Sequence, residues 1–218
     1  MLSHAWRTSL WPYAAHEVVG CNIFGLWDVV PALHSGVPAV LLSDRILRDP
    51  LRLSTAIRSY AITRIMLTPT LVDACLRCPE AVTALSGLRL LVLCGEGISR
   101  SLHSRIAESL PCVRVVNLYS LSECHDVAAG DLPPPGEAIR LRIAPFAEVC
   151  ISHGQERDKV LPDGTAGRIL VGGPGLAQPD RKENAKQNGF FTLPAKGSED
   201  RKVFDTGDRG AISPDGWL

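Results

Sequence analysis

The sequence predicts an α/β fold, in which a mainly parallel sheet with flanking helices is followed by a small β-rich, barrel-like subdomain. Apolar strand-like runs alternate with helical stretches at least three times between residues 37 and 119. After the proline-rich segment 131–139, the apolar runs become short and are separated by Asp-Gly turn pairs, which favour β-hairpins. We therefore expect an α/β subdomain over residues 1–135 and a β-rich subdomain over 136–218.

The first forty residues give the weakest local signals. Residues 1–20 show no clear period, and we expect them to be irregular. Residues 23–34 have apolar positions at mixed helical spacing, interrupted by Pro31. The short apolar run at 36–42, opened by a glycine, predicts the first strand.

From there to residue 119, strand and helix signals alternate clearly. An Asp-Pro pair at 49–50 is typical of a helix N-cap followed by a first-turn proline. The run at 88–95 is almost entirely apolar, as expected of a strand covered on both faces. The expected elements are a helix at about 50–60, a strand at 62–68, a helix over 70–77 capped by Thr70, a strand at 88–95, a helix at 99–110 capped by Ser99, and a strand at 113–119.

Composition excludes several classes of function. The chain has 218 residues, of which 45% are hydrophobic and 21% charged, and 23 basic residues balance 23 acidic ones. Because there is no net positive charge, we expect no nucleic-acid partner. No apolar run is long enough to span a bilayer, and the first residues do not form a secretory signal, so we expect no membrane association and a cytoplasmic location.

Polar residues gather where two consecutive predicted strands end. Gly95 and Glu96 follow one strand, and the polar group Tyr119–Glu123 follows the next. Ligands of open parallel sheets bind at the carboxyl ends of the strands. The two groups are therefore expected to lie at the same edge of the sheet.

Four short motifs occur in a fixed order along the chain: "LCGEGIS" (93–99), "NLYSLSE" (117–123), "GRILVGGPGLAQ" (167–178) and "VFDTGDRGAISPDGWL" (203–218). Together they resemble the adenylate-forming (AMP-binding) enzyme superfamily, and most closely the adenylation domains of non-ribosomal peptide synthetases and similar proteins. The resemblance covers nearly the whole chain. It implies that the chain is part of the large N-terminal domain of such an enzyme.

The resemblance also implies a reaction. A carboxylic acid attacks the α-phosphate of ATP, giving an acyl-adenylate and pyrophosphate, and the acyl group then passes to the thiol of a carrier-protein phosphopantetheine or of coenzyme A. This chemistry depends on positioned phosphates and on a metal ion, here Mg²⁺, that neutralises the developing charge.

The resemblance implies roles for individual residues that would bind the nucleotide. By resemblance, Tyr119 lies against the adenine, Ser122 contacts phosphate, and Glu123 holds Mg²⁺, which prefers carboxylate oxygen. Asp208 would accept hydrogen bonds from both ribose hydroxyls. The sequence departs from the family where Ser120 replaces the usual glycine.

The remaining nucleotide positions come from two of the same motifs. Asn117 begins the segment that contains Tyr119. The backbone of Gly95, Glu96 and Gly97 matches the family segment that passes along the adenine edge. The glycines of "GGPG" are expected to serve the turn after a strand, because no Lys-Ser/Thr pair follows them as in a phosphate-binding loop.

The acyl side follows from the same resemblance. Members that activate α-amino acids carry an Asp where Ile23 stands, so an ordinary α-amino acid does not fit this pattern. Asp126 is the charged residue of an otherwise apolar set, and we hypothesise that it meets a polar or amino group farther along the substrate. The alternative is that Asp126 simply makes a hydrogen bond at the start of a helix. The positions carried over are Ile23, Phe24, Trp27, Met66, Val92, Cys94, Leu118, Asp126 and Val127.

Two alternative functions remain open from the sequence. The glycine-rich phosphate loop ending in lysine and the lysine-bearing C-terminal domain are not found in these 218 residues. We therefore expect little adenylation by the chain alone, and the alternative is a degenerate nucleotide-binding or interaction module without catalysis. A hydrolase using Ser122 or Cys124 with His125 is a weaker alternative, because no nucleophile-elbow motif is present.

Overall fold

The computed structural model describes residues 2–22, 26–154, 159–178, 189–194 and 200–218. The helices of this part are α1 (Leu2–Leu10), α2 (Leu26–His34), α3 (Asp44–Leu47), α4 (Pro50–Ser59), α5 (Pro69–Cys75), α6 (Pro79–Leu85) and α7 (Arg100–Ser109). Its strands are β1 (Val19–Cys21), β2 (Ala39–Leu41), β3 (Arg64–Leu67), β4 (Leu90–Cys94), β5 (Arg114–Leu121), β6 (His125–Asp131), β7 (Arg142–Ile143), β8 (Glu148–Ser152), β9 (Gly167–Gly172), β10 (Phe190–Leu193) and β11 (Arg201–Gly210).

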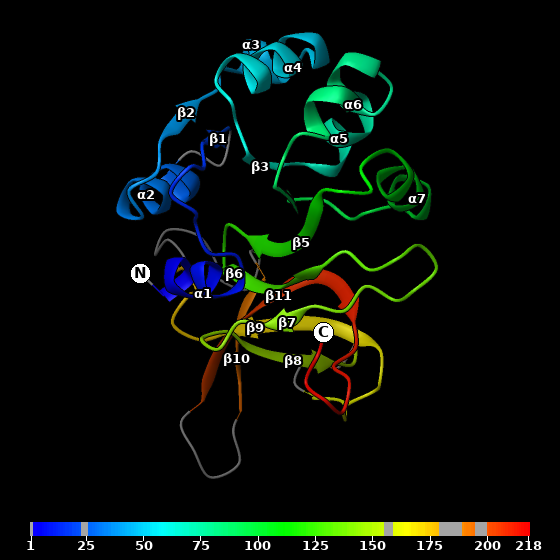
Figure 1. Cartoon of the computed structure of the whole chain (residues 1–218). Coiled ribbons are helices and arrows are strands. Elements are labelled where there is room, and N and C mark those ends of the chain that lie inside the picture. Colours follow the sequence, from blue (N-terminus) through cyan, green and yellow to red (C-terminus); the bar gives the residue numbers. More distant parts are fainter. Residues whose placement is uncertain (1, 23–25, 155–158, 179–188, 195–199) are drawn as a thin grey trace. The chain divides into compact units, whose positions relative to one another are not determined.

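The chain divides into two compact units (Figure 1). Unit 1 comprises Met1–Trp6, Leu118–Gly130 and Arg140–Leu218, and unit 2 comprises Arg7–Asn117 and Asp131–Ile139. The strand order is β2-β1-β3-β4-β5-β6-β7 in one sheet and β10-β11-β9-β8 in the other. The predicted fold class, a mainly parallel sheet with helices followed by a β-rich part, is confirmed.

Unit 2 is built on parallel strands. β1 pairs in parallel with β2 and with β3, and β3 pairs in parallel with β4. A helix connects each strand to the next, and all five residues of β4 are buried, as expected of a strand with helices on both faces. The core gathers the inward side chains of α4–α7 against β3 and β4, with Leu53, Ile65 and Leu67 fully buried.

Three helices of unit 2 begin at capping residues that satisfy their first amides. The Asp49 side chain accepts hydrogen bonds from the amides of α4, and Ser99 caps α7, both as predicted. The prediction that Thr70 caps the next helix was wrong. Thr68 is the cap of α5, because Pro69 takes the first helical position, where its missing N–H costs nothing.

The prediction that residues 1–20 are irregular was also wrong. Residues Leu2–Leu10 form α1, and Val19–Cys21 form the buried strand β1. β1 is only three residues long, and it is a strand because β2 and β3 pair with it on either side. Such pairing is a tertiary effect that a three-residue pattern does not reveal.

A buried ion cluster fixes the segment that precedes β1. The Glu17 carboxylate is fully buried and lies 2.9 Å from the Arg64 guanidinium, and it also pairs with Arg89. Arg64 stacks over the Tyr13 ring at 4.0 Å and donates hydrogen bonds to the carbonyls of Trp11 and Pro12. Charges and carbonyls are therefore compensated where the chain enters the sheet.

Unit 1 contains the antiparallel strands. β9 pairs with β8 on one side and with β11 on the other, and β10 forms the far edge beside β11. Its core includes Cys124, Val127, Ile169 and Val171, which places the β5–β6 turn against this sheet.

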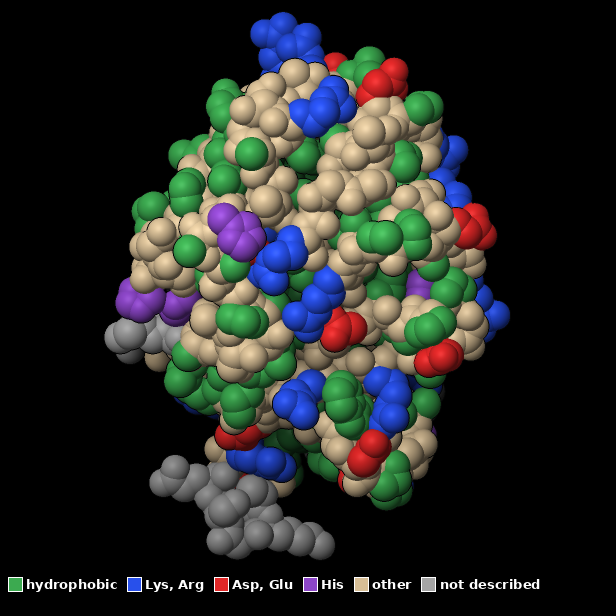
Figure 2. Space-filling view, in the orientation of Figure 1, with side chains coloured by type: hydrophobic (Ala, Val, Ile, Leu, Met, Phe, Trp, Pro, Cys, Tyr) green, Lys and Arg blue, Asp and Glu red, His purple; other side chains and the backbone are tan. Residues whose placement is uncertain are grey.

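The surface carries no concentrated charge of one sign on the face that Figure 2 shows. Acidic and basic side chains are interspersed there among apolar and neutral ones. Within the described residues, no helix combines the length and apolar character needed to cross a bilayer.

Candidate functional site

Two of the predicted nucleotide residues meet in unit 1. The Tyr119 hydroxyl on β5 donates a hydrogen bond of 2.7 Å to the Asp208 carboxylate on β11. Burial raises the pKa of the Tyr119 phenol, and hydrogen bonding to the negative Asp208 raises it further, so the hydroxyl remains a proton donor at neutral pH. Residues 89 positions apart in the sequence thus form one polar pair beside a partly exposed aromatic ring.

Asp208 is presented by a bulge in β11. Asp205 pairs with Leu170 and Arg209 with Arg168, so three residues of β11 lie opposite one residue of β9. Gly207 has φ +84, a conformation that favours glycine. Bulges bend a strand and redirect its side chains, and here the bulge turns Asp208 out of the regular ladder.

The bulge is supported by Asp205, which is not among the residues predicted from the sequence. The buried Asp205 carboxylate accepts hydrogen bonds from Arg168 Nε at 3.0 Å and Nη2 at 2.8 Å. The same oxygen accepts from the Gly207 amide at 3.1 Å. The sequence offered one signal for this pair: Asp205 is an acidic residue inside a strand-like run, and Arg168 lies in the motif that forms the neighbouring strand.

The predicted phosphate and metal residues lie on the β5–β6 turn. Ser122 is exposed and Glu123 half-buried, so both are accessible. Among the described residues, no group of three or more His, Cys, Asp or Glu is placed to hold a metal ion. A single accessible carboxylate nevertheless fits Mg²⁺, which keeps waters and commonly uses one or two carboxylates together with substrate phosphates.

The acyl-side residues of unit 1 follow directly after this turn. Leu118 and Val127 are buried, and Asp126 is 0% exposed. Asp126 lies on the strand β6, so the alternative that it bonds at a helix start was wrong. The Asp126 amide lies 2.7 Å from His125 Nδ1 and donates a hydrogen bond to it. The Ser3 hydroxyl lies 2.9 Å from the same nitrogen.

The burial of Cys124 argues against a hydrolase that uses its thiol as the nucleophile. Burial raises the pKa of the Cys124 thiol to about 12, and the nearby Glu123 charge raises it too. A thiol that stays protonated at neutral pH is a poor nucleophile.

The other predicted nucleotide residues belong to unit 2. Gly95, Glu96 and Gly97 are exposed after β4, and Gly95 has φ +92. The Glu96 carboxylate accepts hydrogen bonds from the amide and the hydroxyl of Thr70 at the start of α5. Glu96 therefore anchors this segment through its side chain and leaves its backbone accessible, and Asn117 lies half-buried on β5.

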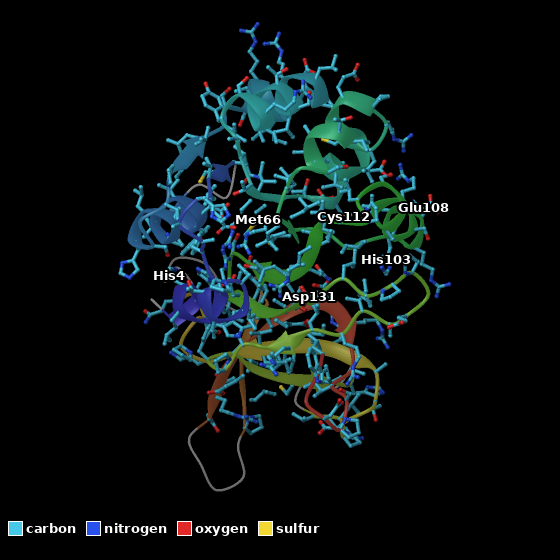
Figure 3. All side chains as sticks on the ribbon, in the orientation of Figure 1. His4, Met66, His103, Glu108, Cys112 and Asp131 are labelled. Carbon is cyan, nitrogen blue, oxygen red and sulfur yellow. The ribbon has the colours of Figure 1, made fainter. Side chains whose placement is uncertain are left out.

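Unit 2 also holds the remaining acyl-side positions. Met66, labelled in Figure 3, lies on β3, and Val92 and Cys94 lie on β4; all three are buried. Trp27 on α2 is 56% exposed. Ile23 and Phe24 lie outside the described residues.

A separate cavity of about 670 Å³ opens in unit 1 beside β10 and β11. Its lining includes Leu176, Phe191 and Arg201, and none of the predicted site residues. It does not contribute to the predicted nucleotide or acyl positions.

Comparison with known proteins identifies the family of this chain. A family model described as AMP-binding enzyme matches residues 21–179. Glycine betaine reductase ATRR of Emericella nidulans is 30% identical over 100% of this chain and 18% of its own length, and tyrocidine synthase 3 of Brevibacillus parabrevis is 29% identical over 90% of this chain and 3% of its own. The chain therefore spans only a small part of these curated relatives.

The fold is shared with solved structures as well. The structure of holo-PA1221, a non-ribosomal peptide synthetase protein with adenylation and peptidyl carrier domains, superimposes with a TM-score of 0.77 at 24% identity. The match covers 94% of this chain and 37% of that one. The family match, the relatives and the order of the motifs agree, and the chain belongs to the AMP-binding enzyme family, with peptide-synthetase adenylation domains among its relatives.

Proposed function

We propose that this chain forms the nucleoside-binding and acyl-binding part of an adenylate-forming domain. In the longer protein it would activate a carboxylic acid with ATP and Mg²⁺ and deliver the acyl group to a carrier-protein phosphopantetheine or to coenzyme A. The observation that carries the proposal is the Tyr119–Asp208 pair on the β11 bulge. A carboxylate held at a fixed position suits the two hydroxyls of a ribose, and a half-buried ring beside it suits a flat base.

Each residue then has a defined task. Asp208 accepts hydrogen bonds from the ribose, and Tyr119 holds Asp208 in place from its other side. Glu123 would hold Mg²⁺ against the phosphates, where the ion supplies positive charge for the developing negative charge. Ser122 would donate its hydroxyl proton to a phosphate oxygen.

Calorimetry on the 218-residue chain tests the nucleoside part. Adenosine and 2′,3′-dideoxyadenosine are titrated into the wild type, Asp208→Asn, and Asp163→Asn as a control in an exposed turn of unit 1. The wild type and the control should prefer adenosine by about tenfold, the value of one good charge-assisted hydrogen bond. Asp208→Asn should lose that preference; an equal preference in all three proteins would refute the assignment.

The acyl-transfer part needs the longer protein. The 218 residues alone are expected to release no pyrophosphate from ATP, because their sequence contains no recognisable lysine-bearing phosphate loop. The longer protein should release pyrophosphate when its acid is present and should lose this activity in Glu123→Ala. Nucleotide binding without pyrophosphate release in the longer protein would instead favour the non-catalytic binding module.

For the substrate, we propose a carboxylic acid that carries a positive charge away from the carboxylate. Asp126 is fully buried, and its carboxylate lies 3.4 Å from His125 Nδ1. A buried negative charge favours a cation, and Ile23 removes the acid that would hold an α-ammonium. The name of the relative glycine betaine reductase gives an acid of this kind, with a quaternary nitrogen.

An uncharged isostere tests this substrate class. Two analogues of the acyl-adenylate, 5′-O-sulfamoyladenosine N-acylated with glycine betaine or with 3,3-dimethylbutanoic acid, differ in one charged nitrogen and have nearly the same shape. The wild type should bind the betaine analogue more tightly, and Asp126→Asn should bind both alike. Tighter binding of the dimethylbutanoyl analogue by the wild type would contradict the proposal.

A further inference from the structure

The residues Gly173–Ala177, here called the bracing loop, follow β9 and lie against the β5–β6 turn that carries Ser122 and Glu123. The Ala177 amide donates a hydrogen bond of 2.7 Å to the Glu123 carbonyl. This bond ties the backbone of the predicted metal-binding residue to a segment more than fifty positions later. The two segments belong to the same compact unit.

Gly175 allows this close approach. A Cβ placed on Gly175 would lie 2.8 Å from the Cys124 carbonyl oxygen, closer than side-chain carbons approach such atoms, and 3.9 Å from His125 Cβ. The obstructing atom belongs to the backbone, so no side-chain rotation can relieve the contact. The loop or the turn must move if Gly175 gains a side chain.

The bracing loop is itself fixed at its start. Gly173 has φ +98, and a Cβ there would lie 2.5 Å from the Phe146 carbonyl oxygen. Phe146 packs edge-to-face with Trp6, with ring centroids 5.9 Å apart. The start of the bracing loop is therefore held close to the Phe146 backbone, two residues before Gly175.

From these contacts we propose that Gly175 is a positioning residue, which through the bracing loop holds the Glu123 carboxylate where it binds Mg²⁺ with the nucleotide. The proposal rests on the function proposed above for Glu123. It explains the glycine motif "GGPG" without contact to phosphate. Supporting residues around a metal ligand typically change metal affinity about 10- to 100-fold when they are replaced.

The test compares Gly175→Ala with Gly154→Ala. Gly154 is also in unit 1, and a Cβ there meets only an Arg168 side-chain carbon at 3.8 Å, an ordinary contact. Ala177→Pro is a second variant, because it removes the amide that bonds Glu123 and leaves Gly175 unchanged. Circular dichroism establishes that each variant is folded.

The first readout is the labelling of individual cysteines by iodoacetamide, followed by mass spectrometry. Cys124 is 2% exposed in the turn, whereas Cys112, labelled in Figure 3, is exposed and reports full reactivity. Gly175→Ala and Ala177→Pro should raise Cys124 labelling at least about fivefold, while buried Cys94 of unit 2 stays protected, as expected of a local opening. Labelling of Cys124 no faster than in Gly154→Ala would overturn the bracing contact.

The second readout is the gain in ATP affinity that Mg²⁺ provides, measured by calorimetry. Gly175→Ala should reduce this gain at least about tenfold and should leave adenosine affinity within about twofold, because Tyr119 and Asp208 are untouched. An unchanged Mg²⁺ gain, or an equal loss for adenosine, would overturn the positioning role. If the wild type shows no Mg²⁺-dependent ATP binding, the function proposed for Glu123 fails and the positioning role fails with it, whereas cysteine labelling still decides whether the brace exists.

Discussion

Replacing Asp205 by Asn should destabilise unit 1 and loosen the bulge that presents Asp208. The substitution preserves shape and removes the charge that accepts two hydrogen bonds from Arg168. A hydrogen bond to a charged group contributes about 1.5–3 kcal/mol and a neutral one about 0.5–1.5 kcal/mol, so each bond loses roughly 1 kcal/mol. The Arg168 side chain is 31% exposed and can regain water, which sets the expected loss at about 2 kcal/mol.

Urea unfolding followed by circular dichroism measures this loss as a lower midpoint with an unchanged slope. A double-mutant cycle with Arg168→Met isolates the pair, and we expect a coupling well above about 0.5 kcal/mol. Asp215→Asn is the control, because Asp215 pairs with Arg140 on the exposed surface and should hardly change the midpoint. Additive effects of Asp205→Asn and Arg168→Met would refute the reasoning.

Three further predictions concern single residues. Burial alone would raise the pKa of Glu17, but hydrogen bonds from Arg89 and the Ala14 amide, with the charges of Arg64 and Arg89, hold it below its ordinary value of 4.5. Its stabilisation is therefore complete above about pH 5 and is lost as the pH falls through the folded-state pKa, so acid titration of the urea midpoint should be shallower in Glu17→Gln. Gly207→Ala should cost about 1–2 kcal/mol in urea unfolding and weaken adenosine binding, whereas Gly216→Ala, at nearly the same φ in open space, should lower stability alone. At pH 8, Cys124 in the wild type should react with iodoacetamide at least about tenfold more slowly than exposed Cys112, because burial raises its pKa to about 12; equal rates would contradict its buried position.

Much of the architecture could be read from local patterns. Three elements could be predicted from a few residues each: β4 from its all-apolar run, α4 from its Asp-Pro start and α7 from its Ser99 cap. Such signals are physical properties of short segments, because capping and two-sided burial require particular residue types. The segment before residue 22 gave no such signal, because α1 and β1 depend on partners far away in the sequence.

For the candidate site, too, the residues could be predicted from the sequence, but the contacts between them could not. The resemblance of the motifs to the family indicates Tyr119, Glu123 and Asp208 as candidate functional residues. Local sequence could not pair Tyr119 with Asp208, nor assign Glu96 to the start of α5, because these contacts join residues that many intervening positions separate. The role of Asp205 could not be predicted from local sequence, because it depends on Arg168 in the neighbouring strand.

What the sequence determined by itself is the alternation of strands and helices between about residues 36 and 119 and the identity of the polar residues in its motifs, since both follow from side-chain polarity and backbone preference. What only the tertiary structure decided is how those residues are held. The bulge at Gly207, the charge pair beneath it and the bracing loop on the β5–β6 turn all arise where two distant backbones approach each other. Close approach depends on the space between segments, and that space exists only once the chain has folded.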